Sequence, residues 1–212
     1  VLFGDGAGAV VIEESKSESD GEIYSFSNGL SSDNLEILEI PNFGSSMDRF
    51  KTDEAARVRW TFDGQEIFKS GVRAMAQASA EAIEKSGLSK EDVEIFIPHQ
   101  ANIRIVEALE KKLRLPNATT IKKVHRYGNT SAASIPTAFV DALEEGEIKG
   151  GEIAVFTAVG AGLAWGACAV RLGDRVTPIN KSDAKLPEFD GTATDTIRRA
   201  IEYQVPDKLD KI

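Results

Sequence analysis

A short apolar run that stops at a proline and is followed at once by a histidine constrains this chain most. Residues 93–97 have the pattern of a buried strand, and Pro98 ends it because proline has no backbone N–H for a sheet. From residue 101 to 113, apolar residues recur at helical spacing, which predicts a helix. His99 therefore lies where a strand passes into a helix, and ligands of α/β sheets bind outside the carboxyl ends of strands. Taken alone, a histidine that only completes a turn is an equally good interpretation.

A second segment strengthens the functional interpretation. Residues 127–134 open another helix, which is expected to run to about Leu143 and to stop at Gly146. Its first turns hold Ser, Ala and Thr, which predicts a helix buried in the middle of the molecule. Asn129 lies at its N-terminus, where N–H groups are unpaired and the helix dipole is positive. It could meet His99 at one thioester carbonyl, although Asn is also a common cap or turn residue beside glycine.

Four segments resemble the motifs of one family. Residues 98–102 and 128–134 are similar to the two late catalytic motifs of the 3-oxoacyl-[acyl-carrier-protein] synthase III family, condensing enzymes of the thiolase-like superfamily. Residues 2–13 resemble its mid-chain glycine turn, and residues 159–166 resemble its last turn. The likeness extends over residues 1–172, and four motifs in order are far more specific than a lone glycine-rich loop.

The fold is expected to be α/β. Asp63, with Glu66 three residues on and an apolar stripe after it, predicts a helix from there to about Ser86, and residues 120–124 are predicted as a further strand. The order strand, helix, strand, helix, strand, turn, strand predicts a sheet rich in parallel pairs. The resemblance implies a thiolase-like fold, with the mixed five-stranded sheet and covering helices of its C-terminal half. Residues 1–14 would be the last hairpin of the N-terminal half, and residues 15–172 the C-terminal half-domain. Residues 173–212 do not resemble the family and form an extension of unknown role, with a candidate helix over residues 190–203.

The resemblance also implies an activity, the decarboxylative Claisen condensation of acyl-CoA with malonyl-acyl carrier protein that begins fatty acid biosynthesis. His99, through Nε2 and with its other nitrogen held by a backbone partner, and the Asn129 amide would donate hydrogen bonds to the enolate. The backbone N–H of Ala161, where the family usually has glycine, would serve the acyl oxyanion. Three further residues match the pantetheine channel and one matches the carrier-docking position: Gln65, Asn102, Ile105 and, for docking, Arg104.

The nucleophilic thiol of this family has no counterpart here. The resemblance places that cysteine before the Val1 position, and the chain begins directly in an apolar strand without a Met. Cys168, the single cysteine, lies among small apolar residues of a predicted strand and is expected to be structural. We therefore expect a missing N-terminal half, or a partner subunit, that carries the Cys.

Two alternatives remain open. The chain could be a non-catalytic companion subunit of a condensing enzyme, docking carrier protein or completing a partner's pocket. It could also be another thiolase-like synthase that makes quinolones or ketones. The other histidine, His125, is expected to be structural because nothing else marks it as reactive.

The composition of the chain limits the classes of partner that it can be expected to bind. The net charge of −9 argues against nucleic acid or an anionic membrane as the main partner. The chain holds no run of about 18 apolar residues, and we expect no secretory signal and, from the single cysteine, a reducing cytoplasm. We expect no metal and no cofactor beyond coenzyme A thioesters and phosphopantetheine as substrate carriers. Expected partners are acyl-CoA, acyl carrier protein and another chain, in a homodimer or heteromer.

Overall fold

The computed structural model describes residues 3–17, 19–33, 35–39, 61–176, 191–192, 194–195 and 197–199. The chain forms two compact units, one made of Val1–Glu39 with Phe62–Ile179 and the other of Ile40–Thr61 with Asn180–Ile212. The predicted site residues all fall in the first unit, which is described here. Of the helix expected over residues 190–203, the described positions 194–195 and 197–199 are helical, and the rest lies outside the described residues.

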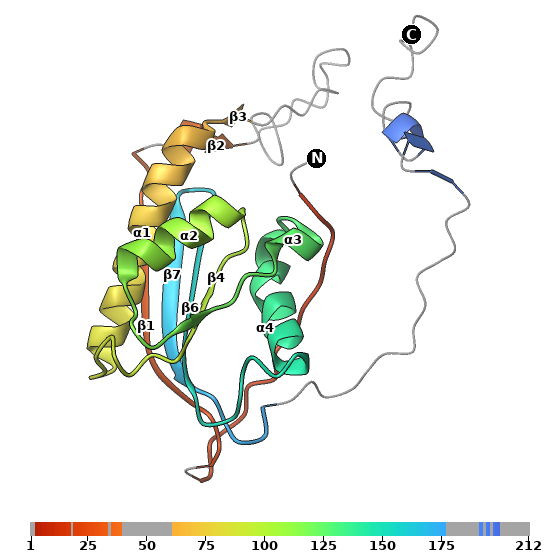
Figure 1. The fold of residues 1–212 in the computed structure, drawn as a ribbon. Coiled ribbons are helices and arrows are strands. Elements are labelled where there is room, and N and C mark those ends of the chain that lie inside the picture. The colour runs from red at the N-terminus through yellow and green to blue at the C-terminus, as the bar shows by residue number, and fades with distance from the viewer. Residues whose placement is uncertain are drawn as a thin grey trace, which may run out of the picture. The chain divides into compact units, whose positions relative to one another are not determined.

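A mixed five-stranded sheet forms the centre of the first unit, as the sequence predicted (Figure 1). Its order is β1 (Glu22–Leu30), β7 (Ala164–Arg171), β6 (Ile153–Gly160), β4 (Ile95–Pro98) and β5 (Thr119–Thr120). The first three strands are antiparallel neighbours, whereas β4 runs parallel to both β6 and β5. The short strand β4, buried along its whole length, is therefore the central parallel strand that leads into the predicted site.

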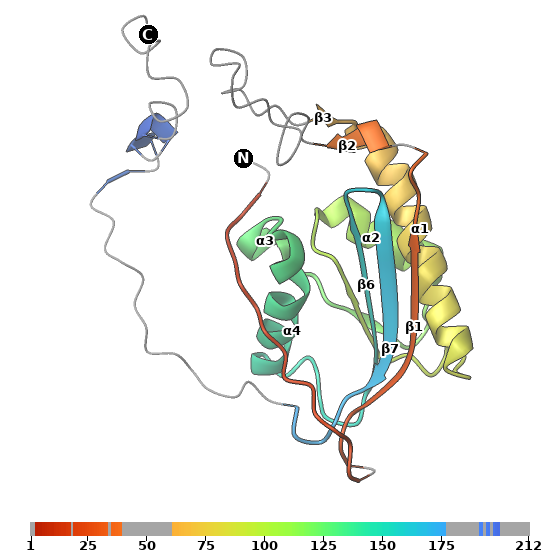
Figure 2. The same cartoon turned by 180° about the vertical axis from the view of Figure 1, so that it is seen from behind.

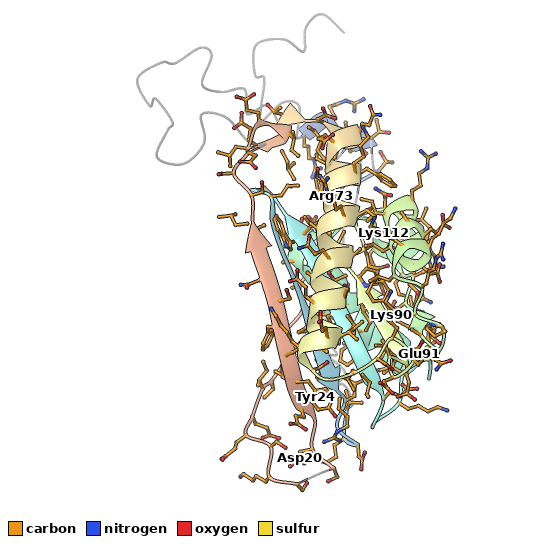
Figure 3. All side chains as sticks on the ribbon, turned by 90° about the vertical axis from the view of Figure 1, so that its left-hand side faces the viewer. Asp20, Tyr24, Arg73, Lys90, Glu91 and Lys112 are labelled. Atoms are coloured by element: carbon orange, nitrogen blue, oxygen red, sulfur yellow. The ribbon has the colours of Figure 1, made fainter. Side chains whose placement is uncertain are left out.

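Two helices cover one face of this sheet, α1 (Gly64–Lys85) and α2 (Ile103–Leu113) (Figures 1 and 2). Figure 3 views this face, with α1 laid along the strands, α2 beside it, and Arg73 and Lys112 labelled on them. The helix α1 begins where the sequence predicted, because the Asp63 carboxylate accepts the N–H groups of the second and third helical residues. The fully buried side chains of this layer include Met75, Phe96, Val106, Leu109 and Val155.

On the opposite face lies α4 (Ser134–Glu144), which follows a 3₁₀ turn at Ser131–Ala133 (Figure 2). Its small residues Ser134, Ala138 and Ala142 are buried against the sheet, but Ser131 and Ala132 before them are exposed, so among the described residues the helix is buried along one face only. They pack with the isoleucines of β4, and the ring of Phe139 meets that of Phe156 edge to face, with centroids 5.6 Å apart. The small side chains let the helix axis approach the sheet closely, and so place its N-terminus beside the end of β4.

The described part of residues 1–14 does not form the expected hairpin. Among the described residues of this segment, the backbone is extended and makes one parallel bridge, between Phe3 and Asn129. It runs beside α3 and α4 in both ribbon views, with Val10, Val11 and Ile12 exposed (Figures 1 and 2). A strand needs a neighbouring strand to pair its N–H and C=O groups, and the described residues offer this segment only that bridge.

The structure also differs from the strand expected over residues 120–124. Residues 120–124 were predicted as a strand, but β5 stops at Thr120 and α3 (Val124–Tyr127) is a single helical turn. The Gln100 side chain accepts the N–H groups of residues 123 and 124, so these groups cannot join a sheet.

Earlier in the chain, η1 (Leu35–Ile37) leads into β2 (Leu38–Glu39), which pairs with β3 (Thr61–Phe62) in a two-stranded sheet. No helix among the described residues is long and apolar enough to span a membrane.

Candidate active site

His99 follows the last residue of β4, at the carboxyl end of the central parallel strands. Its own backbone N–H donates to the carbonyl of Thr157 on β6, at 2.8 Å, so the ladder extends one residue beyond the strand. Pro98, the preceding residue, is still paired with β6 but has no N–H to carry a further strand neighbour. The histidine backbone is therefore held rigidly at the sheet edge where α/β proteins bind ligands.

The imidazole of His99 is anchored by a hydroxyl. Its Nδ1 lies 2.6 Å from Oγ of Ser134, the first residue of α4, while Nε2 has no hydrogen-bond partner among the described residues. Burial lowers the pKa of His99, so the ring is neutral at pH 7 and has one donor and one acceptor nitrogen. The sequence predicted a backbone partner for this ring, and the side chain of Ser134 was missed. The sequence shows Ser134 only as one of several hydroxyl residues near the start of this helix, which does not single it out.

Asn129 is oriented by the loop it opens. Its Oδ1 accepts the backbone N–H of Ser131 at 2.9 Å, and its backbone carbonyl accepts the N–H of Gly4 at 2.9 Å. Ser131 has a φ of +52°, a left-handed conformation that costs a serine roughly 1–2 kcal/mol. The turn interpretation of Asn129 is thus correct for Oδ1, but it leaves Nδ2 without a partner among the described residues.

One buried glutamine joins the two loops. The Gln100 Nε2 donates to the carbonyls of Pro98 and Ile121, at 2.6 and 3.2 Å, and Oε1 accepts from the N–H groups of Lys123 and Val124, at 2.9 and 3.2 Å. The side chain thus makes four hydrogen bonds to three backbone segments while being 2% exposed. It connects the end of β4 to α3, and α3 leads directly into the Asn129 loop.

Ion pairs fix α3 against the C-terminal end of α4. The ammonium of Lys123, whose side chain is 7% exposed, lies 2.5 Å from Glu145 and 3.0 Å from Glu147. Burial opposes its charge, but the hydrogen bonds to the two carboxylates outweigh burial and raise the pKa of Lys123. Arg126 contacts Asp141 at 2.9 Å and Glu145 at 2.6 Å. These pairs hold α3, the helical turn that leads into Asn129, against the C-terminal end of α4.

Residues 83–172 match a family model described as the 3-oxoacyl-[acyl-carrier-protein (ACP)] synthase III C terminal. The matched segment contains β4, α2, α3, α4, β6 and β7, and with them both His99 and Asn129. Residues 83–172 belong to the 3-oxoacyl-[acyl-carrier-protein] synthase III family. The fold is accordingly thiolase-like, as the sequence predicted.

Known synthases III resemble the chain over most of its length. A Vibrio cholerae protein named beta-ketoacyl-[acyl-carrier-protein] synthase III 2 is 46% identical over 205 residues, 96% of this chain and 55% of the relative. Synthase III of Bacillus pumilus is 46% identical over 173 residues, 82% of this chain and 50% of the relative. The crystal structure of the Pseudomonas aeruginosa PAO1 synthase III is 32% identical with a TM-score of 0.72, over 84% of this chain and 52% of that one. The chain spans about half the length of the relatives it matches.

The C-terminal segment 173–212 is shared with one of these synthases. The match to the Vibrio cholerae protein covers 96% of the chain, so it must include most of this segment. The expectation that residues 173–212 resemble nothing in the family is therefore wrong. The match to the Bacillus pumilus protein covers 82% of the chain, so it need not extend into this segment.

The remaining positions taken from synthase III motifs lie on α1, α2 and the last turn. Ala161 is exposed in the turn between β6 and β7, and its φ is not among the positive values, so alanine is accommodated without left-handed strain. Asn102 caps α2, with Oδ1 accepting the N–H of Ile105 at 3.0 Å. Ile105 itself is 4% exposed and packs in the core between α2 and the sheet. Gln65 is exposed in the first turn of α1.

Basic residues on α2 differ in how far they are neutralised. Arg104 is exposed in the first turn and makes no ion pair with any described residue. Lys111 and Lys112 also have no acidic partner in the part of the chain that is described, whereas Lys122 lies 2.7 Å from Glu110. With Lys123 buried in its own ion pairs, the free positive charge of this region is concentrated on α2.

Cys168 lies in the middle of β7, paired in register with Phe156 of β6 and Phe26 of β1. Burial raises the pKa of its thiol, so the thiolate that a nucleophile requires is scarce at neutral pH. These properties favour the structural interpretation that the sequence suggested.

A surface hollow of about 210 Å³ lies between α1 and the turn that follows β6, the turn that also carries Ala161. It is lined by Ser31, Asp33, Ser70, Arg73, Ala74, Gln77, Leu163 and Trp165, none of which belongs to the predicted site. Among the described residues, no group of three or more His, Cys, Asp or Glu side chains is placed to hold a metal ion.

Proposed function

We propose that this chain carries the enolate-stabilising side of a 3-oxoacyl-[acyl-carrier-protein] synthase III, which condenses acyl-CoA with malonyl-acyl carrier protein at the start of fatty acid biosynthesis. The observation that supports the proposal most is a pair of free nitrogens. In His99 and in Asn129, one polar atom of the side chain is fixed by a hydrogen bond, and the other is left unpartnered among the described residues. Such fixed donors need no reorganisation when charge develops on a substrate.

The chemistry follows from where charge develops. When the malonyl thioester loses carbon dioxide, the electron pair of the broken C–C bond becomes an enolate with its charge on the thioester oxygen. Nε2–H of His99 and Nδ2–H of Asn129 would donate to that oxygen, each worth about 3 kcal/mol of barrier in a dry site. The enolate carbon then attacks the acyl thioester, and the backbone N–H of Ala161 would stabilise the tetrahedral oxyanion before the thiol leaves.

We propose that the acyl-bearing thiol comes from the part of a synthase III that this chain does not span, in the same polypeptide or in a partner subunit. Cys168, with its raised pKa and its place inside β7, is a poor nucleophile. The chain alone should therefore stay unacylated when it is incubated with acetyl-CoA and its intact mass is measured. A stable acetyl adduct on Cys168 would overturn this assignment.

Substrates would arrive on coenzyme A and on the phosphopantetheine arm of acyl carrier protein, with no other cofactor. Carrier proteins of this kind are acidic, and the unpaired charge of Arg104 would attract one to the first turn of α2. Gln65 and Asn102 are proposed to border the pantetheine channel, whereas Ile105, 4% exposed in the core between α2 and the sheet, offers almost no surface to it. We also propose a cytoplasmic protein that works as a homodimer or heteromer.

The test uses a fused synthase, in which this chain is joined to the part of the Vibrio cholerae relative that lies outside the match. We expect it to form 3-oxoacyl carrier protein from acyl-CoA and malonyl-acyl carrier protein. His99→Ala and Asn129→Ala should each lower kcat by about 10²–10³-fold. The matched controls are His125→Ala and Asn117→Ala, which remove the same side chains from exposed positions outside the predicted site. Full activity in both His99→Ala and Asn129→Ala would contradict the proposal.

A non-catalytic companion subunit remains the second candidate, and the raised pKa of Cys168 favours it over a complete enzyme in this chain. In that case the fused synthase would bind carrier protein without condensing substrates. A synthase that makes quinolones or ketones would instead release products other than 3-oxoacyl carrier protein, which mass spectrometry of the products distinguishes.

A further inference from the structure

The hydroxyl of Ser134 lies between two groups of the His99 segment. Its Oγ is 2.6 Å from Nδ1 of His99 and 3.2 Å from the backbone N of Gln100. The side chain is 2% exposed, on the first residue of an 11-residue helix. Ser134 is therefore a buried contact that joins α4 to the end of β4.

The directions of these hydrogen bonds follow from what each group can do. The backbone N–H of Gln100 can only donate, so it occupies one lone pair of Ser134 Oγ. The hydroxyl proton then needs an acceptor, and among the described residues Nδ1 of His99 is the acceptor within reach. If Nδ1 carried the proton instead, the hydroxyl of a nearly fully buried serine would be left without an acceptor, which is costly.

We propose that Ser134 is a positioning residue that holds His99 in the tautomer with the proton on Nε2. Nδ1 is then the acceptor of the Ser134 hydroxyl, and the unpartnered Nε2 presents an N–H rather than a lone pair. The positive end of the α4 dipole next to the ring helps to keep the ring neutral, because it disfavours an imidazolium. The catalytic consequence rests on the proposed function, since only an N–H at Nε2 can stabilise an enolate oxygen. The tautomer itself does not depend on it.

The direct test is the long-range ¹H–¹⁵N correlation spectrum of the whole chain labelled with ¹⁵N at histidine, recorded near pH 7.5. The chain has two histidines, so the exposed His125 serves as an internal reference, and His99→Gln assigns the signals. We expect one pyrrole-type nitrogen at Nε2 and one pyridine-type nitrogen at Nδ1 for His99. A proton on Nδ1, or the same tautomer mixture as in His125, would overturn the proposal.

Variants separate positioning from folding. Ser134→Ala should move the His99 nitrogens toward a tautomer mixture, whereas Ser134→Thr, which keeps the hydroxyl, should retain the Nε2–H form. The matched control is Ser79→Ala, which removes another fully buried hydroxyl, one that donates to the Met75 carbonyl within α1. It should leave the His99 signals unchanged. Equal changes in the Ser134→Ala and Ser79→Ala spectra would contradict a specific role of Ser134.

In the fused synthase, Ser134→Ala should lower kcat on the order of tenfold with little change in KM, because it alters the donor and not the binding of the carriers. Rescue by Ser134→Thr is expected. If the spectrum shows the Nε2–H tautomer but the fused synthase does not condense substrates, the proposed function fails and the role of Ser134 stands. If the synthase is active and His99 carries its proton on Nδ1, the role of Ser134 fails alone.

Discussion

At His99, burial works against the charged form of the ring and lowers its pKa below the ordinary value of about 6.5. The unfolded chain therefore binds a proton at His99 at a higher pH than the folded chain does. The stabilising contribution of the neutral ring is fully present above the ordinary pKa, and it is lost as the pH falls through the lowered pKa.

We therefore predict that the free energy of unfolding decreases as the pH falls from 7.5 to 5.5, and that His99→Gln flattens this decrease. Urea unfolding at pH 7.5, 6.5 and 5.5 measures it, with His125→Gln as the control because that ring is exposed. Parallel pH curves for the wild-type chain and His99→Gln would show that burial of His99 is not coupled to folding.

Residue identity was readable from the sequence, but residue orientation was not. The strand–proline–histidine pattern and the small-residue helix singled out His99 and Asn129, because both patterns have simple local causes. Which polar atom of each side chain stays free depends on Ser134 for His99 and on the backbone N–H of Ser131 for Asn129. The contact with Ser134 joins residues 35 positions apart, and that with Ser131 depends on a left-handed turn that a serine rarely adopts.

At the scale of elements, Gln100 links β4, the segment after β5, and α3. Replacing Gln100 by Leu keeps the volume but leaves two buried carbonyls and two N–H groups without their partner. We predict a loss of about 3 kcal/mol in the free energy of unfolding. Urea denaturation measures it, and Gln77→Leu on the exposed face of α1 should change stability by less than about 0.5 kcal/mol. A loss of unfolding free energy in Gln100→Leu no larger than in Gln77→Leu would contradict the linking role of Gln100.

The start of α1 depends on one carboxylate. Asp63 Oδ1 accepts the N–H groups of Gln65 and Glu66, at 3.1 and 3.0 Å. Asp63→Ala should lower the free energy of unfolding by about 1 kcal/mol, whereas Asp63→Asn, which keeps the acceptor, should cost much less. Thermal unfolding of the two variants compares them, and equal losses would mean that the cap is not what holds this helix end.

Elements with a local cause were predicted well, and elements with a distant cause were not. The cap at Asp63 and the apolar stripe that follows it gave α1 within a few residues of its observed bounds. The hairpin over residues 1–14 failed because strands need partners that a local pattern does not supply. The strand predicted over residues 120–124 failed because Gln100, more than 20 positions earlier, captures its N–H groups.

For the whole molecule, part of one sheet face stays uncovered by the described residues. Phe26 and Leu30 of β1 are 62% and 71% exposed, and Cys168 faces the same side as Phe26, its cross-strand neighbour. Under the proposed function, the rest of the synthase would cover this apolar face.

We predict that Cys168 reacts with a maleimide several-fold more slowly in the fused synthase than in this chain alone. The single cysteine of the chain makes the measurement direct, provided that the cysteines of the added part are replaced by serine. Both proteins should react at the same rate in urea. Equal rates under native conditions would mean that the exposed face is not where the rest of the synthase packs.

The proposal that His99 and Asn129 donate to one substrate oxygen is tested most directly by a double-mutant cycle on decarboxylation of malonyl-acyl carrier protein by the fused synthase. His99→Ala and Asn129→Ala should each lower the rate by about 10²–10³-fold. The double variant should be far less impaired than the product of the two losses, because residues that act as a unit are not additive. Losses that simply multiply, or a wild-type rate in either single variant, would contradict a shared oxygen.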